Sequence, residues 1–234
     1  MKFKAGGISL QGSYHNVNQD YYCAVNSPAG LVLALSDGVG SCELSHFGAR
    51  ALCESVIELS FECLCEIDDA KSFLERLNAR WLKKLRGLDV RECACTALFV
   101  VVKDNRFTMF HLGDGVAVVL ADGVPAVTVD IKEEGFRNYT DAMEEKLYFG
   151  SWKVITRTFN ELRGVYLCSD GVGLDQDTVF RYADFAGRFF EEYESLSSDE
   201  IECRIEAWLK DWDGCDDKTI AFALREGAQN DNQP

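Results

Sequence analysis

Residues 31–50 read LVLALSDGVGSCELSHFGAR, and this stretch indicates how the chain folds. The apolar run Leu31–Leu35 predicts a buried strand, and the residues from Ser45 onward predict an amphipathic helix. Asp37 lies between them, directly after the strand and before two glycines. A carboxylate at a strand end is held on a rigid support, so we interpret Asp37 as a ligand.

The rest of the chain predicts strands in hairpins and helices that come separately. This order favours antiparallel sheets covered by helices, an α+β layered fold, over an alternating α/β fold. Ser197 and Glu200 have the spacing of a capping box at the start of the last helix. Strands are expected at 21–25, 31–35, 95–102, 106–112, 116–120, 152–158, 164–168 and 219–224, and helices at 45–60, 69–86 and 197–210.

Composition places the chain among globular proteins. Its 234 residues are 47% hydrophobic and include only 3 prolines, so we expect one domain, 1–226, and a polar tail, 227–234. The net charge of -15 argues against nucleic acid as a partner. No signal peptide or membrane-spanning run is seen, so we expect a cytoplasmic protein that does not bind membranes. The 10 cysteines are then reduced thiols.

Aspartates recur at the ends of the predicted strands. Three of them are followed by glycine, and the sequence S-D-G-V-G occurs twice, each time after an apolar strand. Asp-Gly is also a common turn dipeptide, so a single copy would mean little. These aspartates are Asp20, Asp37, Asp114, Asp170, Asp216 and Asp217.

Such a set of carboxylates suits hard divalent cations. Mg²⁺ and Mn²⁺ prefer oxygen ligands, and clustered carboxylates are costly unless cations neutralise them. Two ions about 3.5–4 Å apart could share one carboxylate and one hydroxide, which is an arrangement used for phosphoryl transfer to water. No phosphate-binding glycine loop or Ser-His-Asp pattern competes with this interpretation.

Five motifs in order carry a resemblance to a known family. The chain resembles the metal-dependent type 2C serine/threonine protein phosphatases, and their bacterial branch in particular, from about Gly12 to Leu224. The resemblance implies a four-layer α/β/β/α sandwich, with two mostly antiparallel sheets flanked by helices and the metals at one end. The motifs are GSYHNVNQD, ALSDGVGSCELSHFGARA, CTALFVVV…FHLGDGVAVVL, VYLCSDGVG and DDKTIAFAL.

The resemblance also implies the ligands of two Mn²⁺ or Mg²⁺ ions. Asp37 would bridge both ions and act in catalysis, and Asp114 would hold a weaker third ion. The spacing D-x-x-[ST] favours Asp216 as the last ligand, with Asp217 as the alternative one position later. The full set is Asp20, Asp37, the carbonyl of Gly38, Asp114, Asp170 and Asp216 or Asp217.

His15 occupies the position where relatives usually have a phosphate-binding arginine. We therefore expect His15 to contact the substrate phosphate, the alternative being a surface or structural histidine. His46 is interpreted as a helix cap or surface residue, and His111 as a structural residue on a strand.

The leading hypothesis is hydrolysis of phosphomonoesters by a water that two metal ions activate. Phosphorylated serine and threonine proteins, the targets of a cognate kinase, would be the substrates, and we expect a monomer. Three departures from the family pattern keep alternatives open, namely Gln19, Val39 and Leu174. They allow a pseudophosphatase that binds phosphoproteins or acts as a sensor. A phosphatase for small metabolites also stays open, because specificity is assigned to the flap segment Asp130–Gly150.

Overall fold

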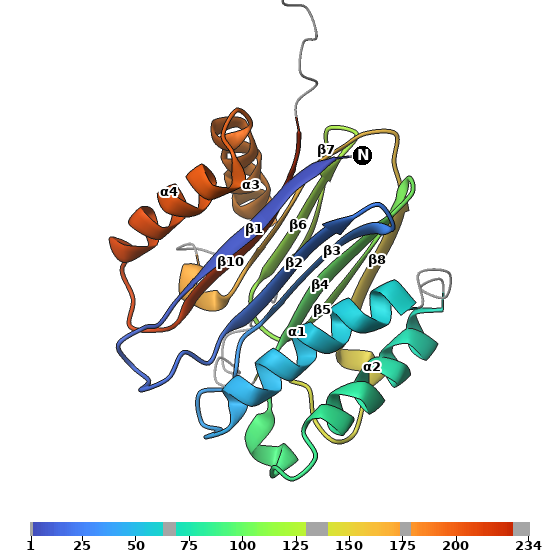
Figure 1. The fold of residues 1–234 in the computed structure, drawn as a ribbon, viewed down its shortest axis with the longest axis vertical. Helices are drawn as coiled ribbons and strands as arrows, with labels where there is room; N and C mark the ends of the chain where they lie inside the picture. Colours follow the sequence, from blue (N-terminus) through green and yellow to red (C-terminus); the bar gives the residue numbers. More distant parts are fainter. Residues whose placement is uncertain (1, 63–68, 130–139, 174–178, 227–234) are drawn as a thin grey trace, which may run out of the picture.

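The computed structural model describes residues 2–62, 69–129, 140–173 and 179–226. Two five-stranded sheets pack face to face, and a pair of helices covers the outer face of each sheet (Figure 1). This arrangement confirms the four-layer sandwich that the sequence led us to expect. The predicted tail, 227–234, Leu174 and residues 130–139 of the predicted flap segment lie outside the described residues.

All strand pairs of both sheets are antiparallel. The first sheet has the order β1 (Phe3–Leu10), β10 (Lys218–Arg225), β9 (Leu162–Cys168), β6 (Val116–Ala121), β7 (Val124–Val129). The second has the order β2 (Tyr21–Ser27), β3 (Gly30–Ser36), β4 (Ala97–Lys103), β5 (Arg106–Leu112), β8 (Lys153–Thr158).

The helices bury apolar stripes against these sheets. α1 (Ser45–Glu62) and α2 (Ala70–Lys84) pack on the second sheet, where Leu52, Trp81 and Phe99 share one core cluster. α3 (Val179–Tyr193) and α4 (Ser198–Lys210) pack on the first sheet. A third cluster fills the space between the two sheets. The fold therefore has three layers of apolar side chains, and a polar functional site is expected at the ends of the strands.

Two strands and one helix were not predicted. β1 and β7 lacked a clear alternation of apolar and polar residues, and β1 contains Gly6 and Gly7. A Cβ at position 7 would lie 2.4 Å from the carbonyl oxygen of Ile220, so this strand needs glycine where its neighbours approach. The predicted capping box is confirmed, with Ser197 as the N-cap of α4 and reciprocal bonds to Glu200.

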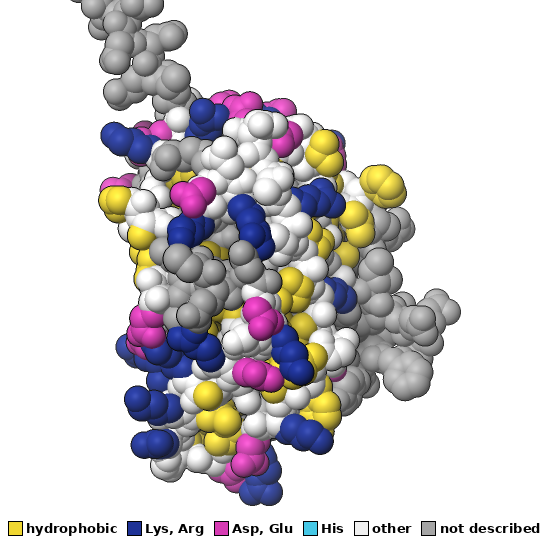
Figure 2. All heavy atoms as spheres, turned by 90° about the vertical axis from the view of Figure 1, so that its right-hand side faces the viewer, with side chains coloured by type: hydrophobic (Ala, Val, Ile, Leu, Met, Phe, Trp, Pro, Cys, Tyr) yellow, Lys and Arg dark blue, Asp and Glu magenta, His cyan; other side chains and the backbone are white. Residues whose placement is uncertain are grey.

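β8 forms an edge of the second sheet and is exposed along most of its length. Figure 2 views the side of the molecule that carries this edge, where lysine and arginine side chains are spread over the surface. Lys153 and Arg157 lie on β8, and charged side chains on an edge strand oppose pairing with other chains. In the described ranges, no helix is long and apolar enough to cross a membrane.

Candidate metal centre

The predicted aspartates come from both sheets. Asp20 precedes β2 and Asp37 follows β3, and the pairing of Tyr21 with Ser36 places these two aspartates side by side. In the other sheet, Asp170 follows β9 and Asp216 lies two residues before β10, which pairs with β9. Strand pairing therefore brings four residues that are distant in sequence to the same end of the sandwich.

The carboxyl groups of Asp20, Asp37 and Asp170 are in contact, with Asp37 in the middle. Burial raises the pKa of Asp37 well above its usual range, and the negative charges of Asp20 and Asp170 raise it further. Burial also raises the pKa of Asp20, although the hydroxyl groups of Thr219 and Ser169 oppose this shift. The charged form of each of these two carboxyl groups therefore carries an electrostatic cost at this position.

A cation would remove that cost, and one atom in particular is suited to bind it. Asp20 Oδ1 is buried and has no hydrogen-bond partner among the described residues. Carboxylate oxygens are the ligands that Mg²⁺ and Mn²⁺ prefer, so the donor set fits these ions. The carboxylates touch in pairs, however, and in the described part of the chain no three or more His, Cys, Asp or Glu side chains are grouped so that they could hold a metal ion.

Backbone contacts hold Asp37 and Gly38 in place. The Asp37 amide donates to Thr96 Oγ1 (2.9 Å), and the Thr96 amide donates to the carbonyl oxygen of Asp37 (2.7 Å). The Gly38 amide donates to the carbonyl oxygen of Gln19 (3.1 Å). A Cβ at position 38 would lie 2.6 Å from Ser45 Oγ, so only glycine fits between the loop and the start of α1.

Asp216 and Asp217 differ sharply in their surroundings. The Asp217 side chain is 3% exposed, and its two oxygens accept hydrogen bonds from the amides of Gly12 (2.7 Å) and Gln19 (2.6 Å). Asp216 is exposed, and its Cβ lies 3.5 Å from where a Cβ would stand at Gly171, the residue after Asp170. Asp217 therefore anchors the loop that precedes β2, whereas Asp216 lies beside Gly171 and its Oδ1 accepts a hydrogen bond from the Asp217 amide (2.9 Å).

His15 lies against the loop that follows Asp37. Its Nε2 is 3.0 Å from the position that a Cβ would take at Gly40, so the imidazole and this glycine loop are neighbours. Gln19, one of the departures from the family pattern, is buried, and its Nε2 donates to the carbonyl oxygen of Cys42 (3.3 Å). The glutamine thus helps to hold the same loop.

The remaining predicted residues lie as follows. Asp114 is buried in the turn between β5 and β6, and its Oδ2 accepts a hydrogen bond from Thr140 Oγ1 (2.6 Å). His111 is fully buried on β5, and its Nε2 lies 2.7 Å from the carbonyl oxygen of Gly113, in keeping with a structural role. His46 is half-buried in the first turn of α1 and packs on Phe47.

Two residues of the site were missed by sequence reasoning. Ser169 Oγ donates to Asp20 Oδ2 (2.8 Å) and accepts from the Thr219 amide (3.0 Å), which ties the two sheets together. Thr96 holds the backbone of Asp37, as described above. For Ser169 a signal was present, because each S-D-G-V-G copy begins with a serine, and Ser36 is also buried and donates to the Thr96 carbonyl oxygen (2.6 Å). No comparable signal points to Thr96.

Comparisons with known proteins agree with this architecture. Residues 13–212 match the family described as Protein phosphatase 2C, so the chain belongs to the protein phosphatase 2C family. The search of curated proteins gave no significant match.

Solved structures share the fold at low sequence identity. The serine/threonine phosphatase Stp1 from Staphylococcus aureus is 14% identical with a TM-score of 0.69, and the match covers 97% of this chain and 96% of that one. The catalytic domain of the serine threonine protein phosphatase PstP, in complex with 2 manganese ions, is 16% identical with a TM-score of 0.64 (95% and 97% covered). RsbX in complex with magnesium is 17% identical with a TM-score of 0.61 (95% and 94% covered).

Proposed function

We propose that the protein is a metal-dependent phosphatase that removes phosphate from serine and threonine residues of other proteins. The observation that carries the proposal is the contact of Asp37 with both Asp20 and Asp170, since carboxylates from two different sheets meet there at an electrostatic cost. The family match supports a phosphatase. The manganese and magnesium ions bound by PstP and RsbX support the proposed class of cofactor.

Two Mn²⁺ or Mg²⁺ ions would be held by the carboxylates of Asp20, Asp37, Asp170 and Asp216 and by the Gly38 carbonyl. We assign the last position to Asp216, because both oxygens of Asp217 already accept backbone hydrogen bonds. Asp114 stays the proposed ligand of a weaker third ion. When bound, the ions would lower the pKa of a water molecule and so supply the nucleophile for hydrolysis.

The chain itself would orient the substrate. His15 lies beside the glycine loop after Asp37, so its imidazole is in place to hold oxygens of the phosphate group, whose charge it would stabilise. Val39, in the same loop, has no proton to give to the leaving group. We therefore propose binding and charge stabilisation, rather than proton transfer from residue 39, as the contribution of this loop.

The proposal is tested with p-nitrophenyl phosphate and Mn²⁺. We expect hydrolysis that EDTA abolishes, and we expect Asp37→Ala and Asp170→Ala to remove it while circular dichroism shows an intact fold. Asp184→Ala is the matched control, because Asp184 lies on α3 and pairs there with Arg188. Activity that survives EDTA, or that survives either site substitution, would contradict the metal-dependent mechanism.

A second candidate is a pseudophosphatase that binds phosphoproteins without turnover. It is favoured by Gln19, whose amide is used to hold the Cys42 carbonyl and which replaces a glutamate ligand of some relatives. Incubation of a phosphothreonine peptide with Mn²⁺ separates the two candidates. Release of inorganic phosphate supports the enzyme, and binding of the peptide without release supports the pseudophosphatase.

A further inference from the structure

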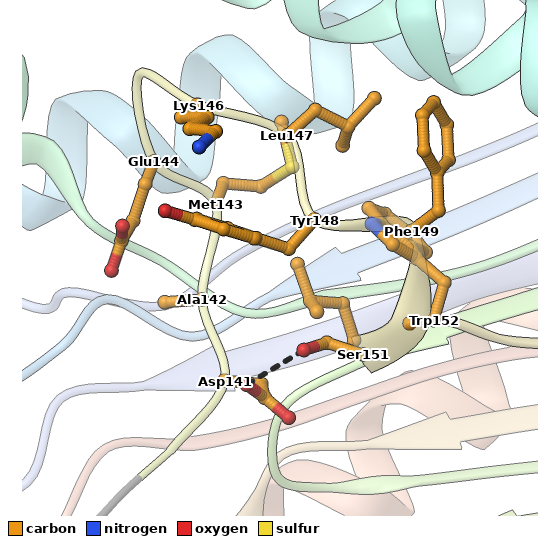
Figure 3. Close-up of a pocket in the computed structure, with 12 residues that line it drawn as sticks. Asp141, Ala142, Met143, Glu144, Lys146, Leu147, Tyr148, Phe149, Ser151 and Trp152 are labelled. Carbon is orange, nitrogen blue, oxygen red and sulfur yellow. Dashed lines mark hydrogen bonds between the residues drawn. The ribbon is translucent and has the colours of Figure 1, made fainter.

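A cavity of about 540 Å³ lies inside the loop that precedes β8 (Figure 3). Residues 141–152 curve around it, and its lining combines apolar and aromatic side chains with the charged ones of Asp141, Glu144 and Lys146. Tyr148 at the mouth is 55% exposed, whereas Trp152 at the bottom is 9% exposed. Met143, Tyr148 and Trp152 are among the residues that line the cavity.

Contacts on both sides hold this loop in shape. The Met143 amide donates to the carbonyl oxygen of Cys95 (2.7 Å), and Ser151 Oγ donates to Asp141 Oδ1 (2.9 Å) across the base of the loop. The Trp152 ring packs edge-on against Phe99 of the core, with the ring centroids 6.1 Å apart. The cavity is therefore built into the fold, as binding sites for small groups usually are.

Trp152, which lines the cavity, has a buried polar atom without a partner in the described ranges. Trp152 Nε1 is buried, and no hydrogen-bond acceptor meets it among the residues that the structure describes. A buried indole N–H normally finds an acceptor, because leaving it unpaired costs free energy. A peptide carbonyl oxygen would supply the missing acceptor, and an apolar side chain of the same peptide would pack on Met143 and Tyr148.

The cavity is close to the proposed metal centre. Cys95 forms a β-bridge with Gly38 on one side and with Met143 on the other. Partners in antiparallel bridges have Cα atoms about 4.5–5.5 Å apart, so Met143 lies roughly 10 Å from Gly38. An extended chain advances about 3.3 Å per residue, so roughly three residues of a substrate would span this distance. The hydrogen bond from Thr140 to Asp114 joins the same loop to the site on its other side.

We propose that this cavity binds the polypeptide substrate: it accepts an apolar side chain about three residues from the phosphorylated serine or threonine, while a carbonyl oxygen of the same peptide accepts a hydrogen bond from Trp152 Nε1. The proposal rests on the phosphatase function proposed above. It favours phosphopeptides over sugar phosphates, because a sugar phosphate bound at the metal centre is shorter than the roughly 10 Å to the cavity.

The test uses phosphothreonine peptides of eleven residues on an alanine and serine background, each with one leucine at a different position. With the unaltered protein and Mn²⁺, we expect kcat/KM to rise about tenfold when the leucine stands near the third position from the phosphothreonine, the discrimination typical of one apolar side chain. Equal rates for all leucine positions would overturn the proposal. The cavity would then bind something else, such as a metabolite or a segment of the chain itself.

Two variants separate the two contacts. Tyr148→Ala shortens the wall of the cavity and should abolish the leucine preference. Trp152→Phe keeps an aromatic ring but removes the N–H donor, so KM should rise about fivefold for peptides with and without leucine, the effect of one neutral hydrogen bond. Phe180→Ala is the matched control, since this aromatic side chain is 85% exposed on α3, in the layer that covers the other sheet. A leucine preference that persists in Tyr148→Ala would overturn the assignment.

The failure of this proposal can be told from a failure of the phosphatase function. Hydrolysis of p-nitrophenyl phosphate tests the phosphatase function alone, because this small substrate does not reach the cavity. If no hydrolysis occurs, fluorescence anisotropy of the labelled peptides measures binding directly. Position-dependent binding that Tyr148→Ala removes supports the docking site, and binding that is independent of leucine position contradicts it.

Discussion

At the scale of single residues, environment decides the role of two adjacent and chemically identical side chains. The spacing D-x-x-[ST] favoured Asp216 as the last metal ligand and kept Asp217 as the alternative, because both are aspartates that directly precede the strand. The structure shows Asp217 buried with two backbone amides on its oxygens and Asp216 exposed. Hydrogen bonds from residues 12 and 19, more than 190 positions away, are invisible to sequence reasoning.

Asp216→Asn and Asp217→Asn should therefore change different properties of the protein, the first its affinity for Mn²⁺ and the second its stability. The first should weaken Mn²⁺ binding at least about tenfold with little change in stability, since the loss of even an outer partner of a metal ligand has that effect. The second should cost roughly 1–3 kcal/mol of unfolding free energy, because an amide group would face a backbone N–H that now donates to a carboxylate. Calorimetric titration with Mn²⁺ and urea denaturation of the metal-free variants measure the two quantities. An unchanged Mn²⁺ affinity in Asp216→Asn would assign the ligand elsewhere.

Protonation of Asp20 and Asp37 should make the metal-free protein more stable in mild acid. Both pKa values are raised above those of the unfolded chain, so the folded state binds more protons above about pH 4, and its stability falls as the pH rises toward 8. Urea denaturation in EDTA between pH 5 and pH 8 measures the slope of the unfolding free energy against pH. Asp20→Asn has no proton to lose and should flatten it. A slope identical in this variant would exclude Asp20 as its source.

At the scale of elements, regular periodicity made most of the fold predictable. The apolar stripes of α1, α2 and α4 and the apolar runs of the central strands were found from the sequence. α3 was missed, although it packs Phe189 and Phe190 into the outer core, and β1 was missed because its glycines interrupt the pattern. Where one element approaches another closely, tertiary contacts dictate the residue, and a local pattern does not reveal it.

Two helical glycines show this difference between packing and propensity. A Cβ at Gly48 of α1 would stand 1.8 Å from the carbonyl oxygen of Cys93, whereas a Cβ at Gly187 of α3 would meet nothing within 4 Å among the described residues. Gly48→Ala should therefore destabilise the protein by roughly 3 kcal/mol, at the upper end of overpacking effects. Gly187→Ala should stabilise it by about 0.5–1 kcal/mol, because alanine is the better helix former. Urea denaturation of the two variants measures both, and equal effects would contradict this packing of α1.

At the scale of the whole molecule, the proposed ligands are divided between the two sheets. The ordered motifs predicted which carboxylates belong together, but only the antiparallel pairing and the stacking of the sheets show Asp37 between Asp20 and Asp170. The hydrogen bond from Ser169 to Asp20 joins the sheets at this end. Ions bound there would connect the two halves of the sandwich.

Mn²⁺ should consequently raise the melting temperature. A ligand that binds only the folded state at 100 times its Kd contributes about 2.7 kcal/mol, which corresponds to roughly 5–10 °C for a chain of this size. Differential scanning fluorimetry in Mn²⁺ and in EDTA measures the shift. Asp37→Ala should lose most of it, and the Asp184→Ala control should keep it. A shift of equal size in Asp37→Ala would place the stabilising ion at another location.

The division of the ligands between two sheets also bears on how such a protein could be inhibited. Tyr22 of the second sheet donates a hydrogen bond from its hydroxyl to the carbonyl oxygen of Gly7 in the first, so the seam between the sheets is closed by specific contacts near the aspartates. A compound that opened this seam would pull the acidic side chains apart. It would switch the protein off without resembling phosphate and without carrying the negative charge that keeps phosphate mimics out of cells.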